Sequence, residues 1–287
     1  MATKLKQDDI VQRAVDGSLA DIKKYAPHEF EDLLSDPVKK EALVHAARKA
    51  AEEEVNLAEE FRAGPCDDIE ARLLKHLPKH RVDLIKTGLE VPTYRLDIQK
   101  THESARPQVN ITRDGKPFLM ESIELNSAAA FAKASWIQIA SIVVEAILLV
   151  LQAVGIKVAV SKQAIAKTAE EIIPVIESSS QIQKAVQALE EAAKGGSKLE
   201  IAKAIFYLIK DSYSASILWK IIKGLCSNMS TWDWIKTAGI VTAMIIAAFA
   251  TDGLALIAKI VLALNSAYEF MKKLTNLQDM KLLEEKL

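Results

Sequence analysis

Two apolar stretches separated by a short polar turn constrain the fold of this chain more than any other feature. Residues Thr237 to Thr251 form an uncharged run of 15, and the next stretch carries one charge, Lys259, before Asn265. The intervening pair Asp252-Gly253 favours a tight turn, because Gly, and to a lesser degree Asp, accepts positive φ. The sequence therefore predicts a buried apolar helical hairpin near the C-terminus.

Neither stretch makes a comfortable permanent membrane span. Such a span needs about 20 consecutive apolar residues, and Lys259 interrupts the second stretch. A third apolar segment, 142–156, carries Glu145, and a charge at the centre of a helix costs about 2.5–3.5 kcal/mol on insertion scales. Helices that are apolar on every face must still be buried, so we expect amphipathic helices to enclose them in water.

The rest of the pattern predicts a mainly α protein, a multi-helix bundle with one small β segment. Helix caps are recognisable before Pro37, at Ser197 and at Ser230, and Gly195-Gly196 fits a helix end. Near 92–125, alternating apolar residues flank Asp114-Gly115, which predicts a small antiparallel β hairpin or meander.

Charge is distributed unevenly along the chain, which predicts three regions. Residues 1–134 contain 45 charged side chains, whereas residues 135–287 contain 30. We expect a polar N-terminal helical region over 1–90, a β-ribbon or connector over 91–127, and an apolar helical-bundle domain over 128–287. Within the first region, the run Glu52-Glu53-Glu54 is expected to form a solvated helix face.

No recognisable motif for catalysis, cofactor binding or metal binding is present, so we expect a non-enzymatic protein without a cofactor. His76 and His80 are four residues apart, but Pro78 between them interrupts the helix that a metal site would need. A formal net charge of −1 provides no basic field for nucleic acid. Cys66 and Cys226 are expected to be structural thiols in a reducing compartment.

The N-terminus lacks the apolar core of a signal peptide. We therefore expect synthesis and retention in the cytoplasm, with release and membrane association only on activation. The layout over 160–287, a wholly apolar hairpin enclosed by amphipathic helices, resembles the pore-forming domains of colicins and related α-helical toxins. The resemblance rests on layout alone. It implies a buried hairpin that inserts into lipid.

The leading hypothesis is a water-soluble α-helical protein that becomes membrane-active, as a pore-forming or membrane-permeabilising toxin or effector. Its partner would be a lipid membrane, with self-association on that membrane. Asp252 at the tip would cross more readily when protonated, so acidic pH should favour insertion. The candidate insertion residues are Ile235, Gly239, Ala243, Ala247, Phe249, Asp252, Gly253, Leu256, Lys259 and Leu262. The candidate interface anchors are Trp232, Trp234, Tyr268, Lys272 and Lys273.

Two alternatives remain open at this stage. The chain could be a non-enzymatic interaction or structural module whose apolar helices never leave the core. It could also be a lipid-binding bundle with a cavity beside those helices. The small residues Gly239, Ala243 and Ala247 recur every four positions and permit close helix contact. Such a stripe serves a membrane interface and a protein core equally well, so it does not decide between the hypotheses.

Overall fold

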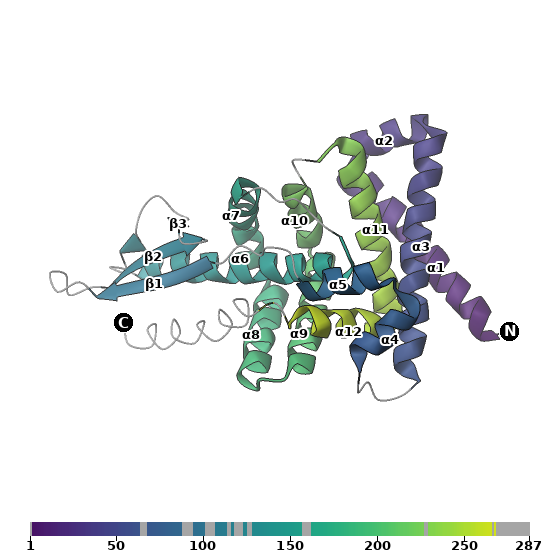
Figure 1. Cartoon of the computed structure of the whole chain (residues 1–287). Coiled ribbons are helices and arrows are strands. Elements are labelled where there is room, and N and C mark those ends of the chain that lie inside the picture. Colours follow the sequence, from purple (N-terminus) through teal and green to yellow (C-terminus); the bar gives the residue numbers. More distant parts are fainter. Residues whose placement is uncertain are drawn as a thin grey trace. The chain divides into compact units, whose positions relative to one another are not determined.

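A computed structural model describes residues 2–63, 68–87, 94–100, 107–113, 116–117, 123–124, 128–156, 162–226, 229–265 and 267. This part of the chain is a mainly α-helical bundle, as the sequence predicts (Figure 1). The chain separates into two compact units, each assembled from non-contiguous segments. Unit 1 comprises 1–88, 150–159 and 225–263, and unit 2 comprises 89–149, 160–224 and 264–287.

Local sequence signals determine where the helices of unit 1 begin. The Asp36 side chain accepts a hydrogen bond from the backbone N–H of Lys39 at 3.1 Å, and Asp68 accepts one from Ala71 at 2.9 Å. The helices of unit 1 are α1 (Ala2–Tyr25), α2 (Pro27–Ser35), α3 (Pro37–Arg62), α4 (Ile69–His76), α5 (Lys79–Thr87), α11 (Thr231–Ala250) and α12 (Leu254–Ala263).

Helix α1 is continuous, although Asp16-Gly17 followed by Ser18 suggests a break and a new helix cap. The Ser18 hydroxyl instead donates to the carbonyl of Val15 at 2.8 Å, within the helix. A Cβ at Gly17 would lie 2.7 Å from Ile246 Cδ1 of α11. Gly17 therefore permits close packing between two helices, and tertiary contact outweighs its weak helix propensity.

The apolar helices α11 and α12 meet at a corner. Helix α11 packs along α1 and α3, whereas α12 packs mainly on α3, α4 and α5 and has little contact with α11. In Figure 1, α12 runs across the end of α11 instead of back along it. The predicted antiparallel hairpin is therefore not confirmed, because α12 finds its apolar contacts on other helices.

Unit 2 holds the remaining described helices, except for the last residues of α6 and α10, which belong to unit 1. Helix α7 contains Pro174 without ending there, and Ser216, with φ of 62°, separates α9 from α10. The residues from Ser141 to Val154 are all buried, as expected for an apolar segment. The helices are α6 (Ala128–Ala153), α7 (Lys162–Ser178), α8 (Ser180–Lys194), α9 (Lys198–Ser214) and α10 (Ile217–Leu225).

Four short strands lie between α5 and α6 in the chain: β1 (Tyr94–Lys100), β2 (Pro107–Arg113), β3 (Lys116–Pro117) and β4 (Ile123–Glu124). Strand β2 pairs antiparallel with each of the other three, and Tyr94 lies opposite Arg113. The side chains of these strands lie outside the described residues, so the alternating burial behind the predicted ribbon stays a prediction.

Candidate functional site

Helix α11 lies between α1 and α3 and is enclosed mainly by small and branched apolar side chains. Ala243 and Ala247 belong to one buried cluster with residues of both neighbouring helices: Val11, Ala14, Val15, Ala47, Ala51 and Val55. Gly239 continues the same stripe. A Cβ there would lie 2.7 Å from Leu43 Cδ1 and 3.3 Å from Ile22 Cδ1. The small-residue stripe is thus fully used for packing inside unit 1.

Both ends of α11 are capped by polar groups. At its start, the Ser230 hydroxyl accepts from the backbone N–H of Asp233 at 3.2 Å and donates to the Asp233 carboxylate at 2.6 Å. At its end, the buried Thr251 hydroxyl donates to the carbonyl of Ala247 at 3.0 Å. Asp252 and Gly253 have φ of 58° and 71°, which confirms the predicted turn.

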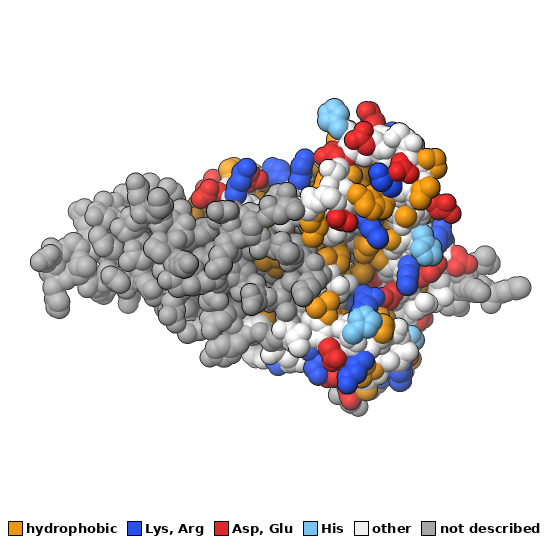
Figure 2. Space-filling view, turned by 45° about the horizontal axis from the view of Figure 1, so that its top comes forward, with side chains coloured by type: hydrophobic (Ala, Val, Ile, Leu, Met, Phe, Trp, Pro, Cys, Tyr) orange, Lys and Arg blue, Asp and Glu red, His pale blue; other side chains and the backbone are white. Residues whose placement is uncertain are grey.

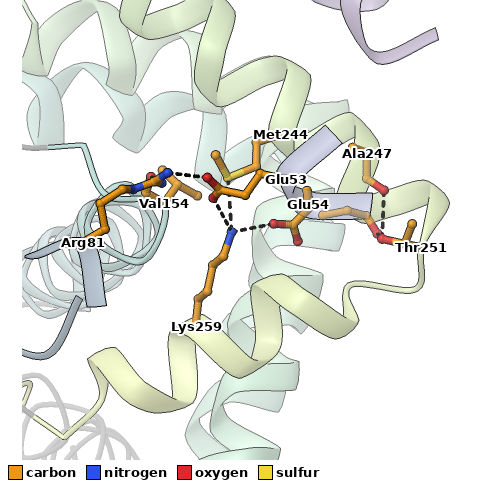
Figure 3. A network of polar contacts seen from close by, with 9 residues as sticks. Glu53, Glu54, Arg81, Val154, Met244, Ala247, Thr251 and Lys259 are labelled. Carbon is orange, nitrogen blue, oxygen red and sulfur yellow. Dashed lines mark hydrogen bonds and ion pairs between the residues drawn. The ribbon is translucent and has the colours of Figure 1, made fainter. Parts of the chain in front are cut away.

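A network of buried charges joins α12 to α3 (Figure 3). The Lys259 side chain is wholly buried, and its Nζ lies 2.8 Å from Oε2 of Glu54, which is also wholly buried. The same Nζ lies 3.4 Å from Oε1 of Glu53 and 3.9 Å from Sδ of Met244 on α11. A single ammonium group therefore contacts two consecutive carboxylates of one helix.

The network continues outward to α5. Arg81 forms an ion pair with Glu53 and donates to the carbonyl of Val154 at 3.0 Å. The Glu53 and Arg81 side chains are 15% and 26% exposed, so this end of the network reaches the surface. The order Arg81–Glu53–Lys259–Glu54 alternates in sign, and its four formal charges sum to zero.

Burial dominates the electrostatics of Glu54. Loss of hydration raises its pKa above the ordinary value of 4.5, while Lys259 opposes the rise. The oxygen Oε1 of Glu54 has no well-formed hydrogen bond among the described residues. Replacing such a pair by apolar side chains of similar volume is often neutral or stabilising. The pair therefore restricts where α12 can pack, because any other position would leave a buried charge without a partner.

Most of the predicted insertion residues are buried inside unit 1. Phe249 is half-buried and Asp252 is exposed at the turn; the others are buried: Ile235, Gly239, Ala243, Ala247, Gly253, Leu256, Lys259 and Leu262. Among the predicted anchors, Trp234 is buried and Trp232 is half-buried. Tyr268, Lys272 and Lys273 lie outside the described residues.

Sequence reasoning missed the acidic partners of Lys259. The prediction of a solvated Glu52-Glu53-Glu54 face is right for Glu52 only, since Glu53 is half-buried and Glu54 fully buried. A signal was available: Glu54 lies seven residues after Ala47 and four before Ala58, on the apolar stripe of α3. A lysine alone in an apolar helix also requires a buried acid somewhere in the fold.

Elsewhere in the described residues, Glu145 of α6 and Glu190 of α8 are also buried, and Glu190 lies 3.5 Å from Lys194 Nζ. His76 Nε2 lies 3.3 Å from Glu60 Oε2 at the surface, and no described group of three His, Cys, Asp or Glu could hold a metal ion. Burial raises the pKa of the Cys226 thiol to about 11, which makes it a weak nucleophile. Positive and negative side chains are interspersed over the coloured surface in Figure 2.

No protein-family model, no curated protein and no solved structure matches this chain.

Proposed function

We propose that this protein is membrane-active: it stores α11 inside a helical bundle and inserts that helix into a lipid bilayer when the bundle opens. The observation that supports the proposal is the character of α11. Helix α11 has 20 residues, and its most apolar 18-residue window has a mean hydropathy of 1.4, so by length and composition it could cross a membrane. At about 1.5 Å per residue, such a helix matches the hydrocarbon thickness of about 30 Å.

The burial of α11 supports storage as its resting state. In its most apolar window, 61% of the residues are buried, and the Gly239 stripe contacts both α1 and α3. Insertion would expose or re-pair those surfaces, so an opening step must come first. Helix α12 has ten described residues and extends about 15 Å, half of the hydrocarbon thickness. Helix α11 is accordingly the proposed spanning element.

A reversible tether between α11 and α3 tests the proposal. A Cβ at Gly239 would lie 3.7 Å from Leu43 Cγ, so cysteine side chains at these two positions would lie in contact. The variant Gly239→Cys/Leu43→Cys is made with Cys66 and Cys226 replaced by Ser. Dye release is measured from vesicles of phosphatidylcholine and phosphatidylglycerol at pH 5 and pH 7.

The reduced variant should release dye and the oxidised one should not, because the disulfide keeps α11 on α3. The parent without the two new cysteines is the control for the oxidant. Absence of release from the parent at micromolar protein, at both pH values, contradicts membrane activity. Equal release from the oxidised and reduced variants contradicts insertion of α11.

One observation favours a second function, a non-enzymatic interaction module whose apolar helices stay in the core. The close approaches at Gly17 and Gly239 are those of a tightly packed interior. This alternative predicts that the oxidised tether changes no activity of the protein.

A lipid-carrying bundle has less support. A depression of about 340 Å³ at the end of α11 is lined mainly by polar side chains: Lys6, Gln7, Ile10, Glu59, Arg62, Ala250 and Thr251.

A further inference from the structure

Stability in water does not explain why α12 carries Lys259. The other nine residues of the helix are apolar, and Lys259 is buried as deeply as any of them. A methionine of similar length would fill the same volume without a charge to desolvate. Buried ion pairs are often no more stable than well-packed apolar side chains in their place. Besides restricting where α12 packs on α3, the charge disfavours any state in which α12 enters an apolar medium without Glu53 and Glu54.

The turn after α11 couples the two apolar helices mechanically. Only Thr251, Asp252 and Gly253 separate them. Three extended residues span at most about 11 Å, much less than a bilayer interior of about 30 Å. If the C-terminal end of α11 crosses the bilayer, α12 must therefore leave its place on α3. Insertion in this direction must first separate Lys259 from Glu54 and Glu53.

The ammonium group makes that separation costly where the new surroundings are lipid. Glu53 and Glu54 belong to α3, so the departing Lys259 leaves both acidic partners behind. One lysine at the centre of a helix weakens insertion roughly hundredfold relative to an apolar residue. In water the released ammonium is simply hydrated again. The charge thus penalises the membrane route of α12 in particular.

We propose that Lys259, Glu54, Glu53 and Arg81 form a retention clamp that holds the α11–α12 segment on the bundle and out of lipid. This inference rests on the proposed membrane activity and names its internal restraint. The clamp acts at the junction of α3, α5 and α12, and Arg81 also anchors its outer end to the Val154 carbonyl.

The test compares variants that keep or remove the clamp. Lys259→Met/Glu54→Leu removes one buried cation and one buried anion together. Lys49→Met/Glu52→Leu makes the same chemical change at two exposed positions of α3 and is the matched control. Lys259→Arg keeps the charge. Each protein is tested for dye release from the same anionic vesicles at pH 7, and for hydrogen exchange of α11 without vesicles.

We expect Lys259→Met/Glu54→Leu to release dye at least about tenfold faster than the wild type, the factor that corresponds to 1.4 kcal/mol. The control should match the wild type, and Lys259→Arg, which keeps the charge, should release dye more slowly than the double variant. Amide protection of α11 should not fall in the double variant, so faster release would not reflect simple unfolding. Should its protection fall, urea is used to bring the wild type to the same amide protection as the double variant. Equal dye release by the two proteins at equal protection then overturns the clamp.

The outcomes separate the two proposals. Release by the wild type with no increase in the double variant overturns the clamp and leaves membrane activity standing. An increase of equal size in the Lys49→Met/Glu52→Leu control overturns the clamp as well, since added hydrophobicity alone would explain it. If none of the proteins releases dye, both the proposed function and the clamp are wrong.

Discussion

Replacing Lys259 by methionine removes the one cation that contacts Glu54 in the described residues. The Nζ–Oε2 distance is 2.8 Å, and both side chains are wholly buried. Glu53 keeps Arg81 as a partner and lies near the surface, so it tolerates the change. Glu54 has no such replacement. It must stay charged in an apolar interior or take up a proton.

Because Glu54 can take up a proton, the stability that Lys259→Met loses through this unpaired carboxylate has an upper limit. Its ordinary pKa of 4.5 lies two and a half units below pH 7, and each unit corresponds to about 1.36 kcal/mol. Neutralising it at pH 7 therefore costs at most about 3.4 kcal/mol, near the 3–5 kcal/mol typical of breaking a buried pair. At pH 5 the same limit falls to about 0.7 kcal/mol. Adding Glu54→Leu should restore wild-type stability or exceed it by about 1–4 kcal/mol.

Urea unfolding of the wild type, the two single variants and the double variant measures these energies as a double-mutant cycle. With Trp136 and Trp219 replaced by Phe, fluorescence of Trp232 and Trp234 reports on α11 and hence on unit 1. Lys49→Met at an exposed position of α3 is the control and should not change the midpoint. The reasoning is refuted if Lys259→Met is as stable as the wild type at pH 7, or if its loss grows on acidification.

Two further predictions concern Gly239 and Glu54 of unit 1, and Gly195, the comparison position for the first, lies in unit 2. Gly239→Val should lower the free energy of unfolding by about 1–3 kcal/mol through overpacking against Leu43. Gly195→Ala should be neutral or stabilising, because Gly195 has φ of −69° and an added Cβ would meet only one atom, at 3.5 Å. Urea unfolding measures both variants, and equal losses of stability would contradict the packing argument. Because burial raises the pKa of Glu54, the folded state binds its proton more tightly than the unfolded chain, so this stabilisation is complete below pH 4.5 and is lost as pH rises through the folded pKa. The wild type should therefore gain stability relative to Glu54→Gln as the pH falls from 8 to 5. Surface groups such as Glu60 are present in both proteins and cancel in this comparison. A relative gain for Glu54→Gln over that range would show that the pKa of Glu54 is not raised.

Features encoded within one or two helical turns could be predicted from the sequence. The caps at Asp36 and Ser230 and the turn at Asp252 lie where the residues indicate, because their hydrogen bonds join residues three or four apart. The expected break at Gly17 is absent because the glycine serves a contact with another helix, α11, and does not end α1. Ile246 of α11 approaches closely because Gly17 has no side chain, and the residues next to Gly17 in sequence do not reveal this contact.

The candidate site was predictable only in part. Burial of α11 follows from its apolar faces, and the need for a partner follows from Lys259 itself. The identity of that partner does not follow, since Glu54 lies 205 residues away in the chain. Many acidic residues could in principle have met Lys259, and only the packing of α12 on α3 selects Glu53 and Glu54.

The sequence by itself determined that α11 and α12 are apolar helices joined at Asp252-Gly253, because hydrophobic periodicity and φ preferences act locally. Tertiary structure alone decided that α12 leaves α11 at a corner and that Lys259 is buried against α3. The physical reason is that a helix with several apolar faces has many acceptable neighbours, and a buried charge has few. Desolvation makes an unpaired Lys259 untenable, so α12 can pack on α3 only in a register that brings Lys259 to an acidic side chain.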